Sequence, residues 1–158
     1  MISKIKKEKL DVRKVCNCKW SKKIRSYWRR FGLDDCYVLL GKTNGFVLLI
    51  KIEYEGKDVY GLMFSKKLKF KDVRNILWHE AGHILGEQSE DPVMKEFNAD
   101  KWAIDNALKR GYKNIVREII FRSLSLPRGE EKEVYKKASD MIVTHFKEIC
   151  EKIIKNEF

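Results

Sequence analysis

The sequence predicts an α+β fold: an N-terminal helix, then a three-stranded antiparallel sheet, then a helical C-terminal part. Short apolar runs separated by turn residues cover 36–65, and the apolar period then changes from two residues to 3.6. Strands precede helices instead of alternating with them, which is the order of an α+β fold. With 158 residues we expect one domain, composed of a basic arm at 1–31, a core at 32–111 and C-terminal helices at 112–158.

The first part of the chain is expected to be one helix followed by the sheet. Residues 1–31 combine spaced apolar side chains with many charges, which predicts a helix that stops at Gly32. Asn44-Gly45 supplies the positive φ that a tight hairpin turn needs. The apolar runs predict three strands joined as a meander: 36–41, 46–54 and 59–65.

Cap and stop signals predict the helices that follow. Asp72 is a candidate N-cap of a helix that ends near Gly86. Asp91-Pro92 predicts the start of the next helix, which runs to Gly111. Two more helices are expected, at 113–125 and 130–156.

The net charge of +11 is concentrated in the arm. Residues 1–31 hold twelve Lys and Arg against two acidic residues, so the rest of the chain is nearly neutral. Basic residues interleaved with aromatic ones favour contact with nucleic acid, because cations neutralise phosphates and aromatic rings stack on bases. An amphipathic helix packed on the body, an acidic protein and an acidic membrane surface are the alternatives. The candidate nucleic-acid contacts are Lys19, Lys22, Lys23, Arg25, Arg29 and Arg30.

Hydropathy and composition indicate the compartment. The longest uninterrupted apolar run is 46–50, whereas a membrane span needs about 20 residues, and the N-terminus is too charged for a signal peptide. We therefore expect a soluble, cytoplasmic protein. One Gln, two Thr and abundant Lys, Glu and Ile are typical of thermophiles and of low-GC genomes. Reduced, buried cysteines are expected, with a disulfide or a zinc site as alternatives, for Cys16, Cys18, Cys36 and Cys150.

The motif at 79–83 carries the chemistry. His79 and His83 are four residues apart, so on a helix they share one face with Cβ atoms about 6 Å apart. Two imidazoles at that spacing can bind one zinc ion. Glu80 lies one residue round the helix, where a carboxylate can act as general base on a zinc-bound water. The alternative is that both histidines are ordinary helix residues.

A catalytic zinc needs a third protein ligand, and Glu96 is the best candidate because its helix can fold back beside the first. Asp100, four residues later, can accept the other ring N–H of a ligating histidine. The small residues Ala99, Ala103 and Ala107 would let the two helices pack closely. The alternatives are Glu87, Glu90 and Asp91 in the loop, and Ser89 if 79–86 is interpreted as a metzincin motif.

His79-Glu80-Ala81-Gly82-His83 followed by Glu96-Phe97-Asn98-Ala99-Asp100 resembles the gluzincin metallopeptidases, a zincin class. The soluble minigluzincins and the ImmA/IrrE and CaaX-prenyl-endopeptidase families share this pattern. The resemblance covers about a fifth of the chain, 72–103. It implies a minimal zincin fold with a catalytic core at 32–111, and zinc bound by His79, His83 and Glu96 with Glu80 as base. CaaX-type enzymes span membranes, and ImmA/IrrE proteins usually carry Phe where Trp102 stands.

The expected function is thus that of a soluble zinc endopeptidase acting on peptides or proteins. The alternative is a latent or catalytically silent zincin module that binds DNA or a protein partner through its basic arm. A donor for the charge of the transition state is also required. The candidates, each of which could instead serve packing, are Tyr112, Arg117, Tyr135 and His145.

Overall fold

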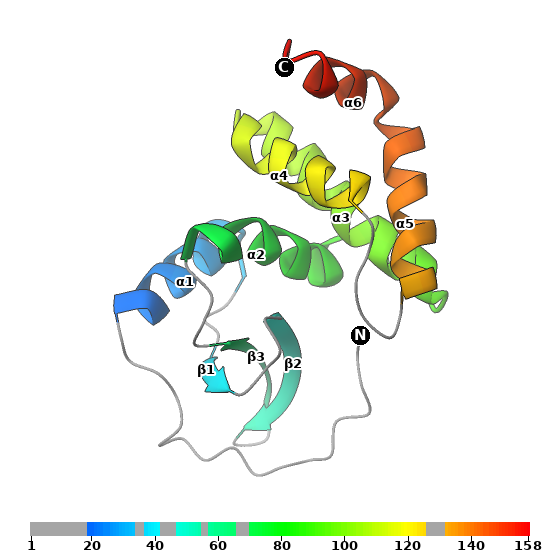
Figure 1. Cartoon of the computed structure of the whole chain (residues 1–158). Helices are drawn as coiled ribbons and strands as arrows, with labels where there is room; N and C mark the ends of the chain where they lie inside the picture. Colours follow the sequence, from blue (N-terminus) through cyan, green and yellow to red (C-terminus); the bar gives the residue numbers. More distant parts are fainter. Residues whose placement is uncertain (1–18, 34–36, 42–46, 55–56, 66–69, 126–131) are drawn as a thin grey trace. The chain divides into compact units, whose positions relative to one another are not determined.

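The computed structural model describes residues 19–33, 37–41, 47–54, 57–65, 70–125 and 132–158 (Figure 1). The chain divides into two compact units, Met1–Leu77 and Trp78–Phe158. The predicted single domain, with parts at 1–31, 32–111 and 112–158, stays a prediction. Three features lie outside the described residues: the first 18 residues of the arm, the turn at 43–45, and the cysteines Cys16, Cys18 and Cys36.

The first unit begins with the amphipathic helix α1, Lys19–Arg30. Ile24 and Trp28 lie one turn apart and are fully buried, and the ring of Phe31 packs edge-on against Trp28 at 6.3 Å between centroids. Gly32 follows with φ of +81°, which confirms the predicted stop because glycine adopts this region without a Cβ clash. Burial of the apolar stripe leaves the basic residues on the other side of the helix.

The sheet of the first unit differs from the predicted meander. Strands β1 (Tyr37–Gly41), β2 (Val47–Tyr54) and β3 (Lys57–Ser65) are arranged in the order β1-β3-β2. β2 and β3 form an antiparallel hairpin in which Tyr54 pairs with Lys57, but β1 pairs in parallel with β3. The prediction of an α+β fold built on a three-stranded antiparallel sheet is therefore wrong, since the sheet is mixed and the described chain is mostly helical. Adjacency along the chain therefore did not decide the pairing, because β2 follows β1 in the sequence whereas β3 is the strand that pairs with β1.

Helices α2 (Phe70–Leu85) and α3 (Pro92–Lys109) carry the candidate site. α2 begins at Phe70, so Asp72 lies inside the helix and is not its N-cap. The start of α3 is as predicted: the Asp91 carboxylate accepts a hydrogen bond from the Met94 N–H at 2.9 Å, and Pro92 occupies the first turn. At the other end Gly111 has φ of +75°, and the Tyr112 N–H donates to the Ala107 carbonyl, closing a Schellman motif.

Three further helices complete the second unit: α4 (Lys113–Leu124), α5 (Lys132–His145) and α6 (Lys147–Ile154). α3, α4 and α5 pack against one another, and α6 continues from α5 (Figure 1). The predicted single helix over 130–156 is wrong, because it is interrupted at Phe146. This residue has φ of −106° and ψ of +33°, and its side chain is buried. No Gly or Pro stands at the break, and helical hydrogen bonds continue on both sides of it: the Phe146 N–H donates to the Ile142 carbonyl, and the Phe146 carbonyl accepts from the Cys150 N–H.

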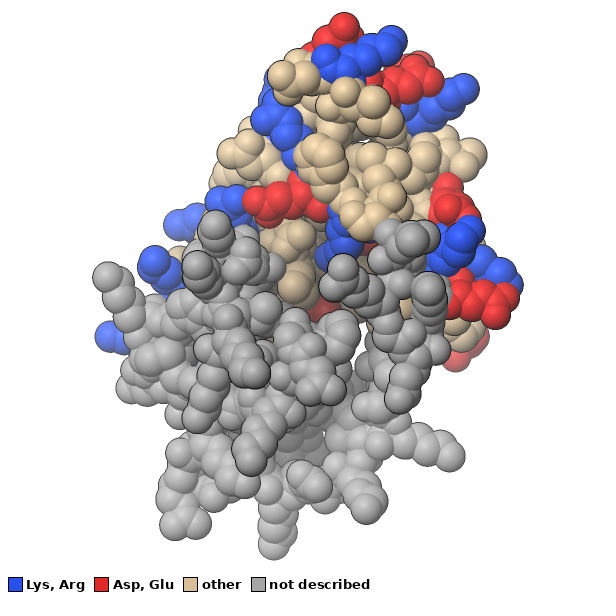
Figure 2. Space-filling view, in the orientation of Figure 1, with Lys and Arg blue, Asp and Glu red and all other residues tan. Residues whose placement is uncertain are grey.

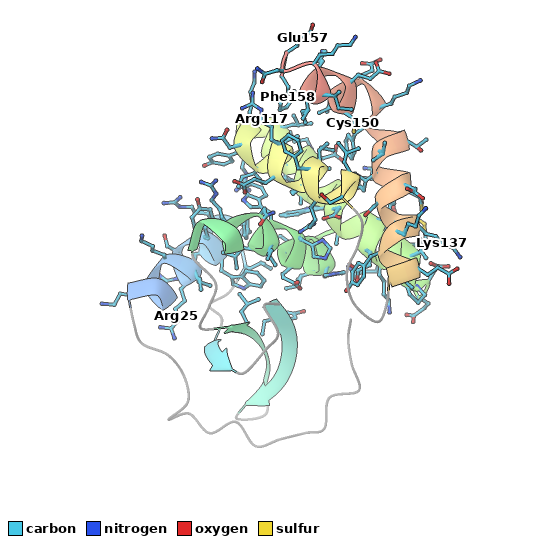
Figure 3. The ribbon with its side chains drawn as sticks, viewed as in Figure 1. Arg25, Arg117, Lys137, Cys150, Glu157 and Phe158 are labelled. Atoms are coloured by element: carbon cyan, nitrogen blue, oxygen red, sulfur yellow. The ribbon has the colours of Figure 1, made fainter. Side chains whose placement is uncertain are left out.

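The chain's last residue is held against α4. Arg117 donates to the backbone carbonyl of Phe158, and the Phe158 ring lies 5.8 Å from the Arg117 guanidinium (Figure 3). Lys113 lies 5.5 Å from the same ring. Among the described helices, none combines the length and apolar character that a membrane crossing requires.

Candidate metal centre

α2 and α3 bring the three predicted ligands together. The Nε2 atoms of His79 and His83 lie 3.0 Å apart. One carboxylate oxygen of Glu96 is 3.1 Å from His79 Nε2, and the other is 3.6 Å from His83 Nε2. Ligand atoms from all three residues lie within 4.8 Å of one another, so the cluster could hold a metal ion.

Small residues allow the two helices to approach. Gly82 lies between the two histidines, and a Cβ at this position would come under 3.0 Å from the Ala99 backbone on α3. Ala99, Ala103 and Ala107 are fully buried, as expected for a stripe of small residues at a helix contact. Helical spacing puts His79 and His83 on one face of α2. The absence of a side chain at Gly82 then allows that face to come close enough to α3 for both histidines to reach Glu96.

Asp100 orients the first histidine. Its Oδ1 lies 2.7 Å from His79 Nδ1, so the ring donates its Nδ1–H to Asp100 and turns Nε2 toward the cluster. Arg122 on α4 donates to the same Asp100 oxygen, and its guanidinium also lies 3.5 Å from His79 Nδ1. The chain Arg122–Asp100–His79 thus joins three helices behind the ligands.

The charges of this cluster depend strongly on one another. Burial alone lowers the pKa of His79, but the charge and hydrogen bond of Asp100, with the hydrogen bond of Glu96, raise that pKa to about 10. Burial raises the pKa of Glu96, but hydrogen bonds from His79 and His83 outweigh it, and the net pKa is well below its usual range. The pKa of Asp100 is also lowered, because the Arg122 and His79 charges outweigh the effect of burial. The metal-free cluster is therefore proton-rich at His79, and a bound cation would take the place of that proton.

Glu80 lies beside the cluster on α2. Its side chain is buried, and burial raises the pKa of its carboxyl above the ordinary value. The charges of His79 and His83 act in the opposite direction, whereas the charge of Glu96 adds to the increase. A carboxyl with a raised pKa accepts a proton more readily than an ordinary one, which is the property that a general base requires.

Aromatic packing and one amide anchor the two helices. Trp78 is 1% exposed and packs against Trp102 at 6.3 Å and against Tyr112 at 5.6 Å between ring centroids. The Asn98 side chain donates to the Glu87 carbonyl at 3.0 Å, which holds the loop after α2 to α3. These contacts fix the residues on both sides of the ligands.

The alternative third ligands are placed elsewhere. Glu87 and Glu90 are exposed, and Asp91 is used as the N-cap of α3. Ser89 accepts a hydrogen bond from the Asp91 N–H at 3.1 Å. Among the described residues, the group with metal-ligand geometry contains Glu96 and none of these four.

The candidate transition-state donors have other described contacts. Tyr112 packs on Trp78, Arg117 donates to the Phe158 carbonyl, and the His145 ring lies edge-on to Phe97 at 5.7 Å. His145 also lines an open hollow of about 380 Å³ together with Phe97, Asp140, Met141 and Thr144. Tyr135 lies on α5. A catalytic role for any of the four stays a prediction.

Cys150 and the basic candidates lie away from the motif in sequence. Cys150 is a free, buried cysteine on α6, as expected (Figure 3). The six Lys and Arg residues predicted to contact nucleic acid all lie in α1. The side chain of Lys19 is outside the described part of the chain. Exposed side chains among them are Lys22, Lys23, Arg29 and Arg30.

Sequence reasoning missed Arg122. It stands 22 residues after Asp100 on another helix, so no local spacing connects the two. A usable signal existed: a buried Asp needs a counter-charge, and Arg122 borders the buried face of α4 formed by residues such as Ile119 and Ser123.

Comparisons of the chain with protein-family models, with curated proteins and with solved structures find no match. The likeness to gluzincins therefore depends on the motif residues themselves and on the cluster that they form.

Proposed function

We propose that the protein is a zinc-dependent endopeptidase. One observation carries the proposal: two imidazole nitrogens and a carboxylate from a His-Glu-Ala-Gly-His helix and its neighbour converge within 4.8 Å. The hydrogen bond from His79 to Asp100 supports it, because histidine ligands in metal sites are typically oriented in this way.

The donor set fits zinc. Three protein ligands of His, His and Glu type leave a position open for water, as in catalytic zinc sites. The same set suits ferrous iron, but the buried carboxyl of Glu80 beside the ligands favours hydrolysis, which requires a base. Zinc, when bound, lowers the pKa of a coordinated water to about 7.

Each residue of the site then has a separate role in hydrolysis. Glu80 takes a proton from the attacking water and delivers it to the amine that leaves, so that its carboxylate is restored after each cycle. His79, His83 and Glu96 would hold the ion, and Asp100 keeps the His79 ring turned so that Nε2 faces the cluster. Arg122 holds Asp100 in place.

The test combines metal analysis with two matched glutamate variants. The wild-type chain is loaded with zinc, its zinc content is measured by mass spectrometry, and hydrolysis of fluorescent casein is followed. Glu80→Gln should keep about one zinc per chain and lose activity by about 10²- to 10⁴-fold, the usual contribution of a general base. Glu87→Gln, in the exposed loop after α2, is the control and should leave activity unchanged. A zinc-free wild type, a zinc-loaded but inactive wild type, or full activity in Glu80→Gln would each overturn the proposal.

A further inference from the structure

The basic residues of α1 occupy one side of the helix. Six of its twelve residues are Lys or Arg and none is acidic. Lys22 and Arg29 are seven residues apart, as are Lys23 and Arg30, so each pair is aligned two turns apart, about 11 Å. The side chains of these four residues are exposed, and Arg25 projects from the same helix (Figure 3). At the left of Figure 2, where Figure 1 places α1, blue atoms project beside the grey surface.

The opposite side of α1 is already used for packing. Ile24 and Trp28 are fully buried and Phe31 is 6% exposed. An amphipathic helix that inserts into a membrane must offer its apolar side to the lipid, and this side is occupied. A protein partner usually supplies or finds an apolar anchor at the centre of an interface, and the solvent side of α1 has none among its described side chains. The surface therefore offers charge and hydrogen-bond donors, which are the groups that contact phosphates.

We propose that the solvent-facing side of α1 binds the phosphate backbone of a nucleic acid. Over the 11 Å that separates the basic pairs, one strand of duplex DNA presents about three phosphates. The Arg30 guanidinium lies 5.3 Å from the ring centre of the part-buried Tyr27, a contact that holds this cation against the helix. No base-reading element is implied, so the binding is expected to be independent of sequence. α1 belongs to the first unit and the metal cluster to the second, so the two proposals can fail separately.

The probe is a fluorescein-labelled 20-mer of mixed sequence, single-stranded and duplex, titrated with the full chain by fluorescence anisotropy between 50 and 300 mM KCl. Four phosphate contacts predict that log K falls with log[salt] with a slope of about −3 to −4. A first variant replaces the exposed cations of α1 by Gln: Lys22, Lys23, Arg29 and Arg30. A second variant, Lys22→Gln with Lys23→Gln, serves if the first does not fold. The matched control removes the same charge from exposed positions in the second unit: Lys109, Lys147, Lys152 and Lys155.

The first variant should bind at least tenfold more weakly at 100 mM KCl and show a slope smaller by about 3, whereas the control should bind within about threefold of wild type. Absence of binding at 50 mM KCl and 100 µM protein would overturn the proposal. So would an equal loss in the control, tighter binding to poly-glutamate than to DNA, or binding only to vesicles of phosphatidylserine and phosphatidylcholine.

Discussion

Asp100 provides a sharp test of the site, because one carboxylate oxygen connects a metal ligand to a cation on another helix. Asp100→Asn keeps the size and an acceptor atom but removes the charge that His79 and Arg122 both contact. Outer partners of metal-bound histidines typically contribute 10- to 100-fold in metal affinity, which corresponds to about 1.4–2.8 kcal/mol. The Asp100 side chain is 11% exposed, so solvent screens this interaction weakly.

The variant should also lose stability in the metal-free state. Removing one partner of a fully buried ion pair costs about 3–5 kcal/mol. The Arg122 side chain is 35% exposed and can turn toward water, so we expect about 1–2 kcal/mol. Both effects are measurable, by chelator competition for zinc affinity and by urea titration for the free energy of unfolding.

Asp105→Asn is the matched control on the same helix. Asp105 forms an ion pair with Lys101 at 2.9 Å, four residues away at the surface, and such pairs contribute about 0–1 kcal/mol. It should leave zinc affinity unchanged. Wild-type zinc affinity in Asp100→Asn, or an equal loss in Asp105→Asn, would refute the role given to Asp100.

Four further predictions concern packing, pH and metal. Gly82→Ala should destabilise the chain by about 1–3 kcal/mol in urea and weaken zinc binding, because the new methyl meets the Ala99 backbone; a more stable variant would contradict the close contact. Zinc binding should release close to one proton per ion at pH 7 and should tighten as pH rises toward 10, because the pKa of His79 is about 10 and its proton must leave. Calorimetry in buffers of different ionisation enthalpy measures the number of protons released. Zero release would contradict the prediction. By the same shift, the metal-free chain should gain stability from His79 below pH 6.5 and lose it as pH rises through 10. Chelation of zinc should lower the free energy of unfolding by about 2.7 kcal/mol relative to protein at 100 times the Kd, and equal melting temperatures with and without EDTA would argue against a folded-state metal site.

The cluster could be predicted because most of it is local. His79 and His83 share a helix face by spacing alone, and Gly86 with Asp91-Pro92 marks where the chain reverses. The reversal returns Glu96 to the same place, and the small residues Gly82 and Ala99 allow the contact. Each of these signals lies within about twenty residues.

The failures of prediction have non-local causes. β1 pairs with β3 and not with β2, the strand that follows β1 in the sequence, a choice that strand propensity and turn residues do not encode. Phe146 interrupts the last helix with no Gly or Pro at that position, so no local signal marks the break. Arg122 reaches Asp100 from a helix whose placement depends on packing.

The central claim is that His79, His83 and Glu96 hold a zinc ion beside Glu80. A crystal structure of the zinc-loaded chain, with diffraction measured on both sides of the zinc absorption edge, tests it most directly. The account predicts one anomalous peak bounded by His79 Nε2, His83 Nε2 and the Glu96 carboxylate, with Glu80 next to it and not bound to it. A peak surrounded by cysteine sulfurs, or histidines that remain hydrogen-bonded to Glu96 with no peak between them, would contradict it.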